Sequence, residues 1–468
     1  MPVRTRRERA SLEPGASNGA ARGDNRLALV DQALFAGHRA AGLNLVIQCV
    51  WIYDHHIDFD GLKRCHHNLG YGLLGRRIEL SPLPFGRPRW VSDQRPPDID
   101  IAECARPRAE LGDWADERSQ LPIDAERGPG WHLGVLPLTD GSTAVSLVLS
   151  HYLVDGLGLA LSIADAALGN TRDLGYPPPG SRTRRRAVVQ DIRLSAQDAP
   201  DVARAFFAAA RLARKQARAQ RGIARPPAPR PVAPGGEDVV VVPAVSIHVD
   251  SAEWDARARA LGGTGNTLVA GFAAKLAERV GRRRDGDGTV TLHLPINERV
   301  EGDTRANAMS IAIVNVDPTR VTMDLNDIRA AIKRALATLR EAPDESLQLR
   351  ALIPFTPKRA LKRMVDAGFC DPDVPVLCSN LGDLGPLVCR LDGTDGELVL
   401  TRATGHQFSR GWLERVGGQM TLQSWRTGGA TVYLTVNAYQ PGAENTKPAL
   451  RELAARTLAE FDLTGTID

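Results

Sequence analysis

The sequence predicts a mixed α/β (or α+β) protein built from two lobes. The chain has 468 residues, enough for two lobes of about 200 residues each. Segments typical of strands and segments typical of helices alternate in both halves, which favours layered lobes over an all-helical or all-strand fold. A basic, proline-rich stretch separates the halves, and its clearest part is RPPAPRPVAPGGED at residues 225–238.

The first lobe is expected to span residues 26–175. It opens with a helix over residues 26–40, because apolar side chains recur there at helical spacing. LNLVIQCVWIY at residues 43–53 is rich in β-branched and aromatic residues and predicts a strand. Asp60 is placed to cap a helix over residues 61–70. The remaining elements expected in this lobe are a hairpin with strands 132–138 and 143–150 around a turn at Asp140, and a helix over residues 157–168.

A crossover at residues 176–238 is expected to join the lobes. It begins with the basic segment YPPPGSRTRRR and contains a helix over residues 198–221, where alanine and arginine dominate. The second lobe then fills residues 239–468. Its expected strands are 239–249, 289–294, 310–316, 374–379, 419–425 and 431–439, and its expected helices are 251–261, 266–280 and 447–461.

Composition excludes several classes of protein. Lys and Arg total 59 against 55 Asp and Glu, and aromatic residues make up 5%, which argues against a nucleic-acid partner. No apolar run approaches the length of a membrane span. Residues 1–25 are basic without the apolar stretch of a signal peptide, so we expect a disordered tail on a cytoplasmic protein. The six cysteines form no C-x-x-C pair and predict reduced thiols: Cys49, Cys65, Cys104, Cys370, Cys378 and Cys389.

Two arginine-rich segments, residues 182–186 and 211–221, are interpreted first as solvated charge. The functional alternative is docking to phosphate groups, to an acidic protein or to an anionic membrane surface.

The pattern H-x-x-x-D-G occurs twice, from His56 to Gly61 and from His151 to Gly156. The second copy follows an apolar strand and precedes an apolar helix, so its imidazole is expected at a fixed place where a buried strand ends. Asp155 can brace the turn, Gly156 permits a close backbone, and the helix N-terminus offers free N–H groups to an oxyanion. The competing interpretation of His151 is a buried, hydrogen-bonded structural histidine.

The first copy looks like an exposed strand-to-helix turn. His55 and His56 lie among acidic residues, and the helix that follows is polar. The nearby pair His66 and His67 is interpreted as solvated. Adjacent histidines point to different faces of a helix, so this group makes a poor chelate and no metal site is expected.

Beyond these patterns, LVLSHYLVDGLGLALSIADA at residues 147–166 resembles the active-site segment of the condensation-domain and chloramphenicol-acetyltransferase-like superfamily of acyltransferases. The closest branches by motif are the bacterial wax ester synthase/diacylglycerol acyltransferases and the polyketide-associated acyltransferases. Further resembling segments follow in the family's order, and the first copy of the pattern falls in the family's first strand–helix unit: residues 56–77, LPIDAERGPGW at 121–131, GNTLVAGFAAKLA at 265–277, residues 294–317, and VLCSNLGDLGP at 376–386.

The resemblance implies two similar lobes arranged as a V with a tunnel between them. It makes His151 the general base that deprotonates an acceptor attacking a thioester, and it makes Asp155 structural, with Arg299 of the second lobe as its ion-pair partner. No metal, no cofactor and no covalent acyl-enzyme is implied. The residues that the resemblance brings to the cleft are Asn266, Asn315, Ser379 and Asn380, although strand-end hydrogen bonds and a Ser-Asn turn explain the last three equally well.

Three departures from the family pattern bear on the substrate. Ser150 replaces the first histidine, Asn266-Thr267 replaces Asn-Asp, and Gln120 replaces a proline. Acyl transfer from acyl-CoA or an acyl carrier protein to an alcohol, in lipid or natural-product biosynthesis, remains the leading hypothesis. The alternatives are a condensation enzyme with a carrier-bound donor and an amine acceptor, and a non-catalytic scaffold. We expect a monomer, and membrane contact stays open.

Overall fold

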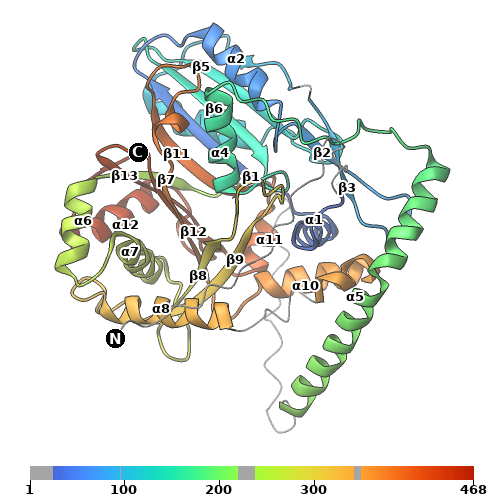
Figure 1. Cartoon of the computed structure of the whole chain (residues 1–468). Coiled ribbons are helices and arrows are strands. Elements are labelled where there is room, and N and C mark those ends of the chain that lie inside the picture. Colours follow the sequence, from blue (N-terminus) through green and yellow to red (C-terminus); the bar gives the residue numbers. More distant parts are fainter. Residues whose placement is uncertain (1–24, 95, 220–237, 342–348) are drawn as a thin grey trace, which may run out of the picture.

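The computed structural model describes residues 25–94, 96–219, 238–341 and 349–468 (Figure 1). Two large sheets organise them, with the first above the second in that view. The tail expected at residues 1–25 and the linker expected at 225–238 lie almost wholly outside the described residues. No helix of the described ranges is long and apolar enough to cross a membrane.

The first sheet has five strands, and β1 lies inside it with antiparallel neighbours on both sides. Nearly every residue of β1 and of its neighbour β6 is buried, which explains their continuous apolar sequence. The order across the sheet is β11 (Glu397–Gly405), β1 (Leu45–Tyr53), β6 (Thr143–Ser150), β5 (Trp131–Pro137) and β4 (Asp100–Ile101), and a separate pair joins β2 (Arg76–Glu79) to β3 (Arg89–Ser92).

Strand β11 corrects the expected division of the chain at residue 239. It comes from the second half of the sequence, yet it pairs along the whole of β1 in the first sheet. A buried ion pair fixes it there, because Arg402 donates to Asp116 at 2.7 Å and to Gln48 at 2.9 Å. The exposed edge of β1 would otherwise leave unpaired backbone groups, and a strand from the other half satisfies them.

The second sheet has seven strands and carries the largest apolar core. Helix α7 (Gly265–Val280) is almost wholly buried against it. The order across the sheet is β14 (Thr466–Ile467), β7 (Ala244–Asp250), β13 (Thr431–Tyr439), β12 (Gln419–Arg426), β10 (Val376–Asp383), β8 (Val290–Asn297) and β9 (Met309–Val316). The other helices of this half are α6 (Ser251–Ala260), α8 (Asn326–Glu341), η2 (Arg350–Phe355), α10 (Lys358–Phe369), η3 (Pro386–Cys389), α11 (Arg410–Arg415) and α12 (Lys447–Glu460).

Helix α5 (Arg184–Ala219) begins well before the expected residue 198. The buried carboxylate of Asp191 explains the early start, since it accepts from Arg89 at 2.9 Å and from Arg182 at 2.8 Å. These tertiary bonds hold a segment whose own polar sequence gave a weak helical signal. The other helices of the first half are α1 (Leu29–Ala41), α2 (Phe59–Leu69), η1 (Arg108–Glu110), α3 (Leu111–Ser119) and α4 (Gly156–Ala167).

Several expected element starts differ from those of the structure. Asp58, and not Asp60, caps α2, because its carboxylate accepts from the Asp60 N–H at 3.0 Å. Strand β7 starts at Ala244, and Val239 forms only an isolated bridge. Thr264 caps α7 in a reciprocal capping box with Thr267.

Candidate active site

His151 is the first residue beyond strand β6, on a short turn that leads into α4. The turn is tied to the strands that precede it, since the His151 N–H donates to Leu45 of β1 at 2.9 Å and Ser150 donates to Gly130 at 2.9 Å. Buried strands on both sides therefore fix the backbone of this histidine.

The His151 ring lies in the wall of a cavity of about 1510 Å³ between the two sheets. Strands of both sheets contribute to this wall, together with α1, α4 and α8. Most of its side chains are apolar, including Leu34, Ile47 and Leu339. The cavity is large enough for an extended ligand, and His151 is the imidazole that faces it.

Burial lowers the pKa of His151 below its ordinary value. Its own carbonyl, the Asp155 carboxylate and the Asn307 side chain act in the opposite direction and reduce the shift. The Nδ1 atom is buried and makes no hydrogen bond of good geometry with the described residues. The ring is therefore neutral near pH 7, the state in which an imidazole can accept a proton.

Asp155 is the N-cap of α4 and is 3% exposed. One carboxylate oxygen accepts from the Gly158 N–H at 2.8 Å. The other accepts from Arg299 at 2.8 Å and from the Ala308 N–H at 2.9 Å. Both oxygens are therefore occupied, and three donors of two lobes converge on one side chain.

Arg299 comes from the loop between β8 and β9, residues 298–308. Besides Asp155, its guanidinium donates to the carbonyls of Asp303, Arg305 and Ala306 at 3.1–3.2 Å. The pairing with Asp155 that the resemblance implied is thus formed, and the same arginine shapes the loop that carries it.

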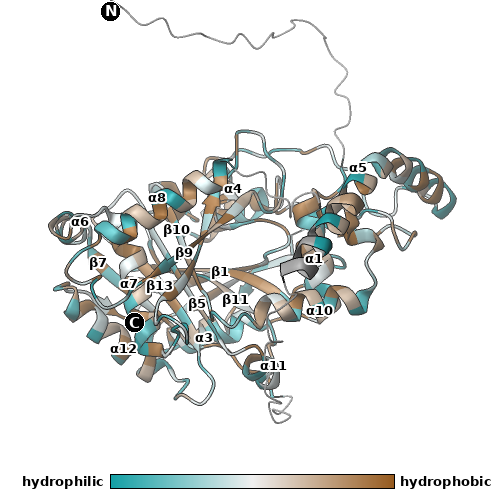
Figure 2. Ribbon diagram, turned by 90° about the horizontal axis from the view of Figure 1, so that it is seen from below, coloured by the Kyte–Doolittle hydropathy of each residue, from teal (hydrophilic) through white to brown (hydrophobic). Residues whose placement is uncertain are grey.

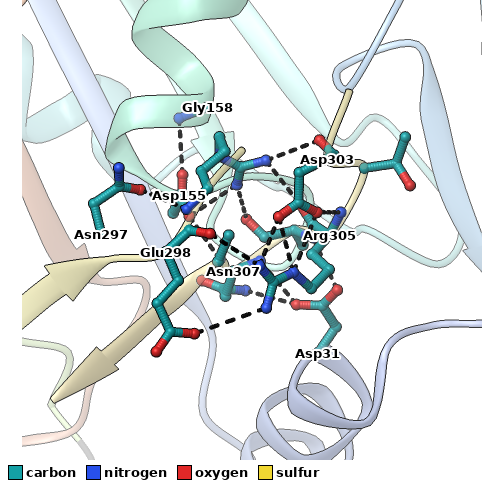
Figure 3. A network of polar contacts seen from close by, with 12 residues as sticks. Asp31, Asp155, Gly158, Asn297, Glu298, Asp303, Arg305 and Asn307 are labelled. Atoms are coloured by element: carbon teal, nitrogen blue, oxygen red, sulfur yellow. Dashed lines mark hydrogen bonds and ion pairs between the residues drawn. The ribbon is translucent and has the colours of Figure 1, made fainter. Parts of the chain in front are cut away.

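Asp31 of α1 holds this loop from the opposite side (Figure 3). Its buried carboxylate accepts from the N–H groups of Ala306 and Asn307, both at 2.8 Å. Burial raises the pKa of Asp31, and these two donors act against that shift. Arg76 closes the arrangement by donating to Thr304 at 2.6 Å. We call the group of Asp31, Arg76, Asp155, Arg299 and Asn307 the interlobe lock.

Solved structures resemble the whole chain. The first condensation domain of the CDA synthetase matches with a TM-score of 0.54 and 14% identity, over 95% of this chain and 99% of that one. The first condensation domain of the calcium-dependent antibiotic synthetase in complex with substrate analogue 2a gives 0.55 and 16%, over 94% and 99%. The condensation domain from the Monacolin K polyketide synthase MokA gives 0.52 and 12%, over 93% and 96%. The chain has the condensation-domain fold. No family model and no curated protein sequence matches it.

Two of the cleft residues expected from the resemblance line the cavity of this condensation-domain fold, namely Ser379 and Asn380 at the end of β10. Asn380 also accepts from the Gly382 N–H at 2.8 Å, as a Ser-Asn turn requires. Asn266 lies outside the main cavity, in a hollow of about 230 Å³, where it accepts from Asn380 at 2.8 Å.

Asn315 does not reach the cavity. It sits exposed on the edge strand β9 and accepts from Thr291 of the neighbouring strand at 3.1 Å. Asn315 shares a face of β9 with Ile311 and Ile313, which line the cavity, but it lies farther along the strand, and its contact with Thr291 is the strand hydrogen bond given above as the alternative.

The first copy of the H-x-x-x-D-G pattern lies away from the cavity. His56 is exposed, and neighbouring His55 contacts Asp54 at 2.8 Å and Thr394 at 3.0 Å. His66 is not solvated as expected, because it contacts the Pro97 carbonyl at 2.8 Å and packs edge-on against Trp131.

Sequence reasoning missed Asp31, Arg76 and Asn307 of the lock. It also missed His38 on α1, whose ring contacts the Tyr152 hydroxyl at 3.1 Å, next to the turn that carries His151. A charged residue on the apolar face of α1 was the available signal for Asp31, since an isolated acid facing a core requires a partner.

Proposed function

We propose that this protein transfers an acyl group from a thioester to a hydroxyl acceptor, with His151 as the general base. The observation that carries the proposal is a neutral, half-buried imidazole in the wall of a large, mostly apolar cavity between two sheets. General-base catalysis needs such a group at a fixed place with room for both substrates beside it.

In the proposed reaction, a neutral His151 nitrogen takes the proton of the acceptor hydroxyl while its oxygen attacks the thioester carbonyl carbon. The carbonyl π electrons move onto oxygen and give a tetrahedral oxyanion. When the oxyanion collapses, the carbon–sulfur bond breaks and the thiolate takes the proton back from His151. The products are the ester and the free thiol, so the protein ends unchanged.

The N-terminus of α4 is suited to the oxyanion. Gly156 and Leu157 both line the cavity and belong to the first helical turn, whose N–H groups have no intrahelical acceptor. Asp155 uses the Gly158 N–H, so the N–H groups of Gly156 and Leu157 are the ones proposed to bind the oxyanion. A Cβ atom at Gly156 would lie 3.0 Å from Leu381 and would narrow the cavity next to the N-terminus of α4.

Asp155 is proposed to position the base and not to relay protons. Its two oxygens accept three hydrogen bonds, and none of them comes from the His151 ring. The same contacts join the catalytic turn of the first lobe to the loop of the second, so the lock sets the width of the cavity at His151.

A second candidate is condensation of a carrier-bound acyl donor with an amine or hydroxyl. The similar structures are condensation domains of synthetases, which favours a carrier protein over coenzyme A as donor. Both candidates share the base and differ in what presents the thioester. A non-catalytic scaffold is the third, and the accessible His151 weighs against it.

The test follows thiol release from acyl-CoA, and separately from an acyl-loaded carrier protein, with a panel of alcohols and amines. We expect release to depend on His151, so His151→Ala should abolish it while His56→Ala matches wild type. Turnover with the carrier alone would assign the donor. Equal activity of His151→Ala and wild type would overturn the proposal, and so would a selective loss in His56→Ala.

A further inference from the structure

Helix α5 runs along the outside of the molecule and projects beyond it (Figure 1). Its inward side is anchored, because Asp191 bonds Arg89 and Arg182, and Asp198 bonds Arg26 at 2.9 Å. Farther along the helix, Ala205 is buried. The opposite side of α5 faces solvent.

The outward side of α5 is strongly cationic. Asp201, the one exposed acid among its described side chains, pairs with Arg204 on the same helix. The exposed cations of the described part of α5 are Arg184, Arg185, Arg186, Arg193, Arg204, Arg211 and Arg214.

Large apolar side chains stand among these arginines. Val189 is 67% exposed, and Phe206 and Phe207 are each 64% exposed. Figure 2 shows hydrophobic and hydrophilic residues alternating along the helix. Phenylalanine side chains are rarely this exposed to solvent on a protein surface, and two adjacent ones indicate an interaction site.

The same character continues on the neighbouring elements. Helix α5 packs on η2, and η2 leads directly into α10. Phe355 of η2 is 50% exposed and Met364 of α10 is 60% exposed. Six of the sixteen large apolar side chains that are exposed in the described residues therefore lie on these three elements. The exposed cations of α10 are Lys358, Arg359, Lys362 and Arg363.

We infer that α5, with η2 and α10, binds the surface of an anionic lipid bilayer. Cations attract the headgroups, and phenylalanines enter the boundary of the acyl region. Phe206 and Phe207 are consecutive on a helix, so they point about 100° apart. Their rings nevertheless meet edge to face, with centroids 6.3 Å apart, so they form one exposed apolar cluster among the arginines. Aromatic side chains set among cations are the composition that inserts at an anionic bilayer surface.

The position of this surface matters for the cavity. Arg350, the first residue of η2, lines the cavity, and α1 contributes Leu29 and Val30 to the same wall while packing on η2 and α10. A bilayer bound at α5 thus lies beside the apolar wall that leads to His151. The inference does not depend on the proposed acyl transfer, and either one can fail alone.

The test is sedimentation of the full chain with vesicles of phosphatidylcholine alone or of phosphatidylcholine and phosphatidylglycerol in equal parts. We expect binding only to the anionic vesicles, weakening as salt rises. Phe206→Ser with Phe207→Ser should weaken binding about tenfold or more. Arg211→Gln with Arg214→Gln should do the same, since each cation near the surface contributes about fivefold.

Matched controls lie elsewhere on the surface. Leu168→Ser with Met323→Ser removes two apolar side chains that are 60% and 68% exposed, and Arg259→Gln with Arg451→Gln removes two exposed cations. Both controls should bind like wild type. Equal loss in controls and α5 variants would overturn the inference. Absence of vesicle binding would also overturn it, as would binding of an acidic carrier protein through Phe206 and Phe207 without any vesicle binding.

Discussion

Removing the carboxylate of Asp155 is a sharp test of the interlobe lock. Asp155→Ala leaves Arg299 as a guanidinium that is 3% exposed and has lost its ion-pair partner, and breaking such a buried pair typically costs about 3–5 kcal/mol. It also removes the N-cap of α4, which is worth about 1 kcal/mol. Arg299 keeps three carbonyl acceptors, which reduces the cost of breaking the ion pair. We expect a total loss of about 4 kcal/mol in the free energy of unfolding.

Urea unfolding followed by tryptophan fluorescence measures this loss. The control is Glu452→Gln on α12, which breaks an exposed ion pair with Arg456 and should cost less than about 0.5 kcal/mol. Adding Arg299→Met to Asp155→Ala removes the stranded charge and should restore about 2 kcal/mol. Two results would contradict this explanation, in which an unpaired buried charge destabilises the protein. One is that Asp155→Ala unfolds at the same urea concentration as the control, and the other is that adding Arg299→Met lowers the free energy of unfolding further.

Three other outcomes are expected. Because burial lowers the pKa of His151, acyl transfer should keep its full rate below pH 6.5, and a kcat profile that already falls above that pH would contradict a neutral base. Burial lowers the pKa of His38 to about 4, so the unfolded chain takes up this proton first as pH falls. His38 should therefore contribute about 3 kcal/mol to the fall in the free energy of unfolding between about pH 6.5 and about pH 4, and His38→Gln should show a shallower slope in the same titration. Gly158→Ala places a Cβ 2.5 Å from Val154 and 3.0 Å from Arg299, so it should cost about 2 kcal/mol in urea unfolding, whereas Gly286→Ala, with open space around it, should cost much less.

The sequence distinguished the two H-x-x-x-D-G copies because the deciding information was local. An apolar run before His151 and another after Gly156 predict a buried strand followed by a helix, and both are present. The acids around His56 predict an exposed turn, and His56 is exposed. The spacing of apolar residues along a segment predicts whether that segment is buried, so this property can be predicted from the sequence alone.

Contacts between distant segments carry no such signal. Asp31 and Asn307 are 276 positions apart, and no spacing rule links an acid on one helix to the N–H groups of a loop in the other half. Strand β11 has an ordinary strand sequence, but nothing in it indicates that it pairs with β1 and not with its own half. Caps fail for a different reason, since Asp58 and Asp60 both suit the start of α2 and only the backbone conformation selects one.

The chemistry of the lock explains why charged groups hold this place and apolar ones do not. A buried ion pair adds little net stability compared with well-packed apolar side chains. Its bonds are directional, however, and here they act on three consecutive N–H groups: Asp31 takes those of Ala306 and Asn307, and Asp155 takes that of Ala308. Apolar packing would let this loop slide by fractions of an ångström. Because Asp155 follows His151 by four residues on the same turn, fixing the loop also fixes His151, and positional precision of that order is what the proposed general-base catalysis requires.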